Sequence, residues 1–192
     1  MNRFLGFLFC ALLLPIQSVV AATLYIDPAF STLERGAAEI LSVRLDTDEQ
    51  AGECVNAAEG VLMLEGPVKA VDVSLGGSIF SVWVEPPTIS QGGKRVTFAG
   101  GIPNGYCGRV DGDPSLTNNL FDIVLRTDAI APANQASVEA TIKFTEQTHA
   151  YLNDGFGTKI TLQTFPKSIT VLPMLSDGSV DPWKDEVALD TQ

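Results

Sequence analysis

Short runs of alternating apolar and polar residues, separated by turn residues, constrain the fold of this 192-residue chain most strongly. The runs Ile40–Leu45 (ILSVRL) and Val68–Leu75 (VKAVDVSL) alternate with a period of two, which is the spacing of side chains along a β-strand. Gly66-Pro67 and Gly76-Gly77 flank the second run. Many short strands separated by such turn residues predict an all-β sandwich or jelly roll.

The same pattern predicts strands along most of the chain. The stretch Thr32–Ile40 is interrupted by Gly36 and is interpreted as a loop or a single turn. Further turns are expected at Pro86-Pro87, Gly92-Gly93 and Asn104-Gly105. The other predicted strands are Leu24–Ile26, Ala58–Leu64, Ile79–Val84, Arg95–Ala99, Leu120–Arg126, Ser137–Thr145, Tyr151-Leu152 and Ser168–Leu172.

The N-terminal segment has the features of an export signal. Arg3 precedes an apolar run, FLGFLFCALLLPI, and small residues follow at Ala21 and Ala22, where cleavage could fall after either one. The apolar run is shorter than the roughly 20 residues that a membrane span requires. We therefore predict a signal peptide over residues 1–22 and a secreted protein, extracellular or periplasmic, with no membrane insertion after cleavage.

The rest of the chain reads as one β-sandwich domain, residues 23–173, and an acidic tail, residues 174–192 (MLSDGSVDPWKDEVALDTQ), which lacks strand alternation and is predicted to be flexible. The formal net charge of the chain is −11. Such an acidic balance argues against nucleic acid as a partner, because phosphate binding needs clustered Lys and Arg.

Two cysteines remain after the predicted cleavage, because Cys10 lies in the signal peptide. An even pair in an oxidising compartment predicts a disulfide between Cys54 and Cys107, with two free thiols as the alternative. Closing a loop of about 53 residues would stabilise the fold by roughly 4 kcal/mol in the chain-entropy model.

Catalytic signatures are lacking. His149 is the only histidine, and no serine stands in a Gly-x-Ser-x-Gly elbow. Carboxylates are plentiful, but a glycosidase pair needs a defined separation across a cleft, which a sequence does not display. We expect a protein that is not an enzyme.

One acidic loop is a candidate calcium site, and no other cofactor is expected. It contains Asp111, Asp113 and Asn118, whose oxygens suit Ca²⁺, although the spacing matches no EF-hand loop. The alternative is a set of Asx turns in an acidic loop.

Four segments follow one another along the predicted domain: VNAAEGVL (55–62), GSIFSVW (77–83), VTFAGGIPN (96–104) and LNDGFGT (152–158). Together, in this order, they resemble the cohesin domain. The resemblance extends over about residues 22–172 and implies a jelly-roll β-sandwich of about nine strands in two sheets. The two cysteines and the long stretch 105–119 depart from the family pattern.

The resemblance implies a protein partner, because cohesins bind dockerin domains through one sheet. Alternation along the corresponding strands predicts which side chains point outward, provided that the assumed register is not shifted by one residue. Exposed apolar residues among them would mark an interface. The predicted partner-binding residues are Glu59, Val61, Met63, Ser81, Trp83, Thr97, Asp122 and Val124.

The predicted function is attachment to a dockerin-like or cell-surface protein, and the alternative is a carbohydrate-binding module that binds polysaccharide. Sugar binding would need a coplanar row of exposed aromatic side chains or a polar groove. The candidates are Trp83, Tyr106, Tyr151, Phe156 and Trp183, which are scattered in the sequence.

Overall fold

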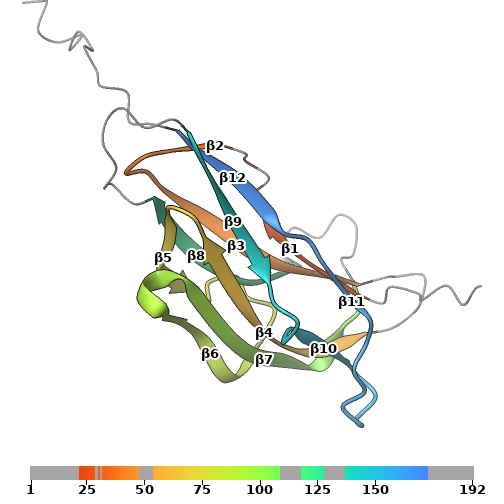
Figure 1. Cartoon of the computed structure of the whole chain (residues 1–192). Helices are drawn as coiled ribbons and strands as arrows, with labels where there is room; N and C mark the ends of the chain where they lie inside the picture. The colour runs from red at the N-terminus through yellow and green to blue at the C-terminus, as the bar shows by residue number, and fades with distance from the viewer. Residues whose placement is uncertain are drawn as a thin grey trace, which may run out of the picture.

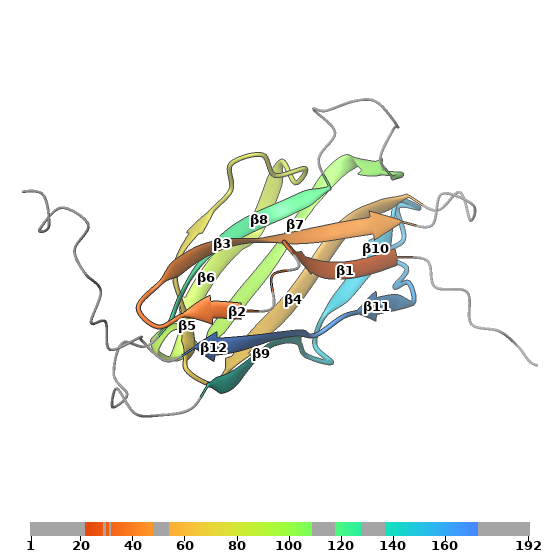
Figure 2. The same cartoon turned by 90° about the horizontal axis from the view of Figure 1, so that it is seen from above.

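The computed structural model describes residues 22–28, 30, 32–47, 54–108, 118–127 and 137–172, which form twelve β-strands and one short 3-10 helix, Gln91–Gly93. The strands build two sheets that pack face to face (Figures 1 and 2). One sheet has five strands in the order β11-β1-β3-β8-β5. The other has seven, in the order β2-β12-β9-β4-β7-β6, with β10 also paired to β4.

The strands differ widely in length, from three residues to twelve. They are β1 (Ala22–Asp27), β2 (Thr32–Glu34), β3 (Ala38–Thr47), β4 (Val55–Glu65), β5 (Val68–Ser74), β6 (Val82–Ser90), β7 (Arg95–Tyr106), β8 (Asn119–Thr127), β9 (Val138–Phe144), β10 (His149–Leu152), β11 (Leu162–Thr164) and β12 (Lys167–Leu172).

The core lies between the two sheets and follows the alternation of the sequence. Along β3, Leu41, Val43 and Leu45 are buried, while the residues between them are only partly covered. Phe98 of the seven-stranded sheet meets Phe121 of the five-stranded sheet, with ring centroids 5.0 Å apart. Burying both inner faces is the main favourable term for a sandwich of this kind. The predicted all-β sandwich of two sheets is confirmed, with twelve described strands where about nine were expected.

Three predicted connections are strand instead. Pro86-Pro87 lies inside β6, which tolerates proline because it is an edge strand whose pairing with β7 shifts in register at this point. Asn104-Gly105 lies inside β7. The stretch Thr32–Ile40, interpreted as a loop or turn, contains β2 and the start of β3.

Several predictions fall outside the described residues. The acidic tail and the signal peptide do so, apart from Ala22, which is buried as the first residue of β1. Both segments stay predictions, and the burial of Ala22 favours cleavage after Ala21 of the two positions. Within the described part of the chain, no helix is long and apolar enough to cross a membrane.

Candidate functional site

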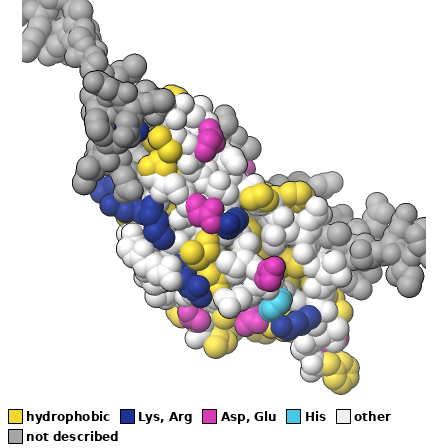
Figure 3. Space-filling model, in the orientation of Figure 1, with side chains coloured by type: hydrophobic (Ala, Val, Ile, Leu, Met, Phe, Trp, Pro, Cys, Tyr) yellow, Lys and Arg dark blue, Asp and Glu magenta, His cyan; other side chains and the backbone are white. Residues whose placement is uncertain are grey.

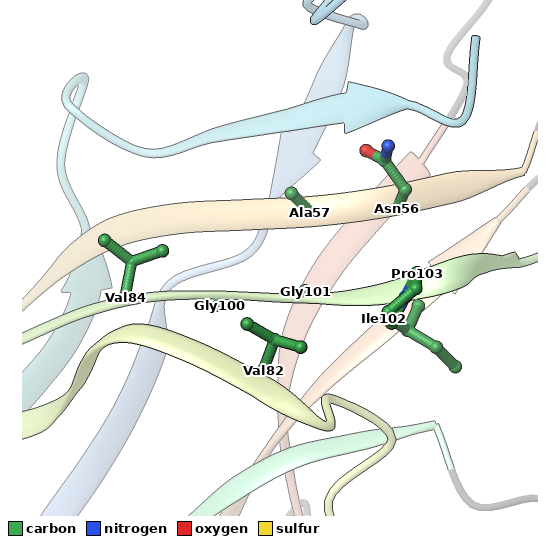
Figure 4. A pocket seen from close by; sticks show the side chains of 8 residues that line it. All are labelled: Asn56, Ala57, Val82, Val84, Gly100, Gly101, Ile102 and Pro103. Carbon is green, nitrogen blue, oxygen red and sulfur yellow. The ribbon is translucent and has the colours of Figure 1, made fainter. Parts of the chain in front are cut away.

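An apolar groove of about 260 Å³ on the seven-stranded sheet crosses strands β4, β7 and β6 (Figure 4). Side chains of β4 form one wall and those of β6 the other, while the glycines of β7 lie between them without side chains. The lining residues are Asn56, Ala57, Val82, Val84, Gly100, Gly101, Ile102 and Pro103, which we call the β7 groove.

Two adjacent glycines of β7 line the groove, and at both of them neighbouring groups approach the backbone too closely for a side chain, on the core side at Gly100 and beside β4 at Gly101. A Cβ built on Gly100 would lie 2.6 Å from the indole of Trp83, and one on Gly101 would lie 2.5 Å from the carbonyl oxygen of Asn56. Glycine within a strand commonly marks such a close approach. The strand between β4 and β6 therefore presents bare backbone.

The β6 wall of the groove is strongly apolar and faces water. Val82 is 50% exposed and Val84 is 86% exposed. Single exposed aliphatic residues are ordinary on protein surfaces, but two that flank an apolar depression on one strand form a patch suited to contact with a partner.

Trp83 was predicted to point outward, and this prediction is wrong. Its ring packs against the core, in edge contact with Phe80 at 5.5 Å and with Phe121 at 6.3 Å between centroids. The cause is a break in the strand: Phe80 belongs to a turn, in which its N–H donates to the Ser78 hydroxyl, and β6 begins only at Val82. Alternation counted from Ile79 is thus shifted by one residue, and the valines point outward instead.

Val61 was expected to be exposed, and this is also wrong, because only 7% of it is exposed. It lies on β4 between β7 and the β9–β10 connection. Its N–H donates to the Thr148 hydroxyl, and its carbonyl accepts from the N–H of Thr145. The neighbouring residue Met63 is partly buried and stands opposite Arg95 and Lys143 on the flanking strands.

Asp122 and Val124 were grouped with these residues by sequence, but they lie on β8 of the five-stranded sheet. Asp122 accepts hydrogen bonds there from Ser42 and Asn119. Val124 stands opposite Ile40, which is 58% exposed. The outer faces of the two sheets point in opposite directions. Asp122 and Val124 therefore cannot belong to the same flat docking surface as the β7 groove.

The remaining predicted residues lie on or beside the seven-stranded sheet. Thr97 is partly exposed and donates to the Glu85 carboxylate at 2.5 Å. Ser81 is exposed just before β6, and its N–H donates to the Gly101 carbonyl beside the groove. Glu59 lies farther along β4, beside β10.

Glu59 forms the polar border of this face with strand β10. It accepts a hydrogen bond from the hydroxyl of Tyr151 and stands opposite His149, which Figure 3 shows in cyan beside charged side chains. The hydrogen bond to Glu59, followed by burial and the negative charge of Glu59, raises the pKa of Tyr151 to about 12.

This shift predicts a pH dependence of stability. The folded state favours the neutral phenol, so its contribution is complete below about pH 10, the ordinary pKa of tyrosine, and is lost as the pH rises towards about 12. In an ultraviolet titration of the folded protein, Tyr151 should ionise near pH 12. Glu59→Gln should return its pKa towards about 10. Equal titration curves for wild type and Glu59→Gln would contradict the assignment.

The predicted disulfide between Cys54 and Cys107 is present. It joins the residue before β4 to the residue after β7, at the end of the sheet where the β7 groove opens. The same corner holds Asn153, whose N–H donates to the Cys54 carbonyl and whose side-chain amide donates to the Asn104 carbonyl. The disulfide and the two hydrogen bonds of Asn153 together hold three segments at this corner.

Of the three predicted calcium ligands, only Asn118 is described by the structure, because Asp111 and Asp113 lie outside the described residues. Asn118 is buried, and its side-chain oxygen accepts from the Arg44 guanidinium at 3.1 Å. A cation at that oxygen would lie beside another cation, so Asn118 is poorly suited as a ligand. Among the described residues, no group of three His, Cys, Asp or Glu side chains could hold a metal ion.

No protein-family model matches the chain, and no curated protein matches it by sequence. Solved structures do match its fold. A type I cohesin of Clostridium thermocellum, solved in a cohesin–dockerin complex, aligns with a TM-score of 0.57 at 9% identity, covering 82% of this chain and 97% of that one. A cohesin module of a Clostridium perfringens family 33 glycoside hydrolase gives 0.55 at 13% identity, covering 81% and 98%.

A third structure, the sixth cohesin of Acetivibrio cellulolyticus scaffoldin B in complex with a dockerin, gives a TM-score of 0.54 at 12% identity and covers 79% of this chain and 99% of that one. The chain therefore has a cohesin-like fold, as the sequence resemblance implied. At these identities the likeness establishes the fold alone.

Proposed function

We propose that this chain is an exported, non-catalytic binding module that attaches a protein partner through the outer face of its seven-stranded sheet. The observation that carries the proposal is the β7 groove, an apolar depression with a bare glycine floor and a wall formed by Val82 and Val84. Interface cores are depleted in charge and well packed, and this part of the face offers apolar surface with no charged residue in its lining.

The cohesin-like fold supports a protein as the partner. Two of the similar cohesins were solved in complexes with dockerins. We therefore place a dockerin-type module, or another exported or cell-surface protein, first among candidate partners. A disulfide fits the oxidising conditions outside the cytoplasm, which supports export.

The arrangement of aromatic residues favours protein over polysaccharide. Trp83 packs inward, and Tyr106 is buried. Tyr151 is engaged with Glu59, while Phe156 lies beyond β10 on a loop. Among these four candidates only Phe156 is largely exposed, so they form no row of exposed rings on which a sugar chain could stack, and the fifth candidate, Trp183, lies outside the described residues.

An affinity experiment separates the two functions. The oxidised protein, residues 22–192, is immobilised and exposed to the exported proteins of its source organism, while the soluble protein is mixed with insoluble cellulose and chitin. We expect a protein to be retained that excess soluble module competes off, with no depletion onto either polysaccharide. Bait that has been unfolded, reduced and alkylated is the control. Depletion onto cellulose or chitin without a protein partner would overturn the proposal.

A further inference from the structure

The loop between β10 and β11 carries the most exposed large apolar side chain of the described residues. Phe156 is 90% exposed on this loop, which extends from the body of the sandwich in Figure 1. Full exposure of a phenyl ring forgoes the favourable free energy of removing it from water.

This loop is closed by its own hydrogen bonds. The N–H of Phe156 donates to the Asp154 carboxylate at 2.8 Å, and the N–H of Leu152 donates to the Thr158 carbonyl at 2.9 Å. Hydrogen bonds from the Thr158 hydroxyl and from the Phe156 backbone lower the pKa of Asp154, so this carboxylate stays charged and keeps accepting at neutral pH. The ring is therefore presented on an ordered turn.

The base of the loop is joined to the end of the β7 groove. Asn153 donates through its side chain to the carbonyl of Asn104, the residue after groove-lining Pro103. Gly105 leaves room for this contact, since a Cβ there would lie 2.6 Å from the Asn153 amide. Tyr151, on β10 just before the loop, stands opposite groove-lining Ala57 on the neighbouring strand β4. Loop and groove thus form one corner of the molecule, fixed by the disulfide.

We propose that Phe156 is a second anchor for the protein partner that occupies the β7 groove, inserting into an apolar pocket on that same partner; this inference rests on the proposed function. A specific interface takes roughly 20–30 residues on each side, far more than the eight residues that line the groove. A partner seated in the groove must extend over neighbouring surface, and the Phe156 loop projects beside it. Exposed aromatic residues that become buried at an interface commonly dominate its affinity.

Photo-cross-linking tests the proposal in the oxidised full chain. p-Benzoylphenylalanine is placed at position 156, at groove position 84, or at position 165, where the native Phe165 is 48% exposed after β11. The proteins are exposed to exported proteins of the source organism, and cross-linked products are identified by mass spectrometry. We expect positions 156 and 84 to cross-link to the same polypeptide, and position 165 to give little product.

Affinity for that polypeptide is then measured with alanine variants. Phe156→Ala should weaken binding tenfold or more and leave the melting temperature unchanged, while Phe165→Ala should change affinity less than twofold. Cross-linking at position 84 alone would overturn the Phe156 anchor but leave the proposed function intact. Cross-linking of position 156 to another polypeptide, or to a second copy of this chain, would also overturn it. Absence of products at both positions would overturn the proposed function itself.

Discussion

Replacing Cys54 and Cys107 together with serine is expected to lower the free energy of unfolding by about 4 kcal/mol. The disulfide closes a loop of 53 residues between the start of β4 and the end of β7, so its loss restores conformational freedom to the unfolded chain. For a domain of this size the melting temperature should fall by roughly 10 °C. Urea unfolding followed by circular dichroism measures the change.

The variant should still fold, because β4 and β7 remain paired along most of their length and the core between the sheets is untouched. Wild-type protein treated with a reductant is the control and should unfold at the same urea concentration as the variant. A loss below about 1 kcal/mol would show that the cross-link does not restrain the unfolded chain as the entropy model requires.

Trp83→Ala is expected to lower the free energy of unfolding by about 2–3 kcal/mol, because it removes a partly buried indole from contact with Phe80 and Phe121. A cavity would also open under Gly100, whose backbone packs on this ring. Val84→Ala, one residue further along the same strand, is the matched control and should change stability by less than about 0.5 kcal/mol.

The outcome distinguishes two arrangements of β6. Had Trp83 faced solvent, as alternation from Ile79 predicted, Trp83→Ala would leave stability nearly unchanged and Val84→Ala would be the costly variant. Equal unfolding curves for wild type and Trp83→Ala would therefore contradict the packing of the indole described here.

The sheet architecture was predictable from sequence because most strands obey strict alternation. Along β3 from Ile40 to Thr47 and along β8 from Phe121 to Thr127, buried residues alternate with more exposed ones in a single phase, so pattern alone identifies both the strand and its inner face. The Cys54–Cys107 pairing was also accessible, because only one pairing is possible for two cysteines in the predicted mature chain.

The candidate site was predicted less well, for two physical reasons. The turn at Phe80 and the register shifts of β6 change the phase of alternation, and one residue of phase decides between Trp83 and Val84 as the exposed side chain. In addition, strand pairing over long sequence separations places β8 with β3 and β5, which no local pattern reveals.

The β7 groove could have been suspected from its glycines. The sequence AGGIP was interpreted as the end of a strand, whereas β7 continues through it to Tyr106. Two adjacent glycines flanked by strand residues on both sides indicate a backbone stretch without side chains, which is what a shallow groove requires. Walls for such a groove still depend on the register of β4 and β6.

Docking of the partner on the seven-stranded sheet over the β7 groove is tested by measuring the affinity of the captured partner for two charge-matched variants. They are Val84→Asp on the groove wall and Ile40→Asp on the outer face of the other sheet. Both add one carboxylate at an exposed, β-branched strand position. We predict a loss of at least thirtyfold for Val84→Asp and less than twofold for Ile40→Asp. Unchanged affinity for Val84→Asp, or a larger loss for Ile40→Asp, would show that the partner does not dock over the β7 groove.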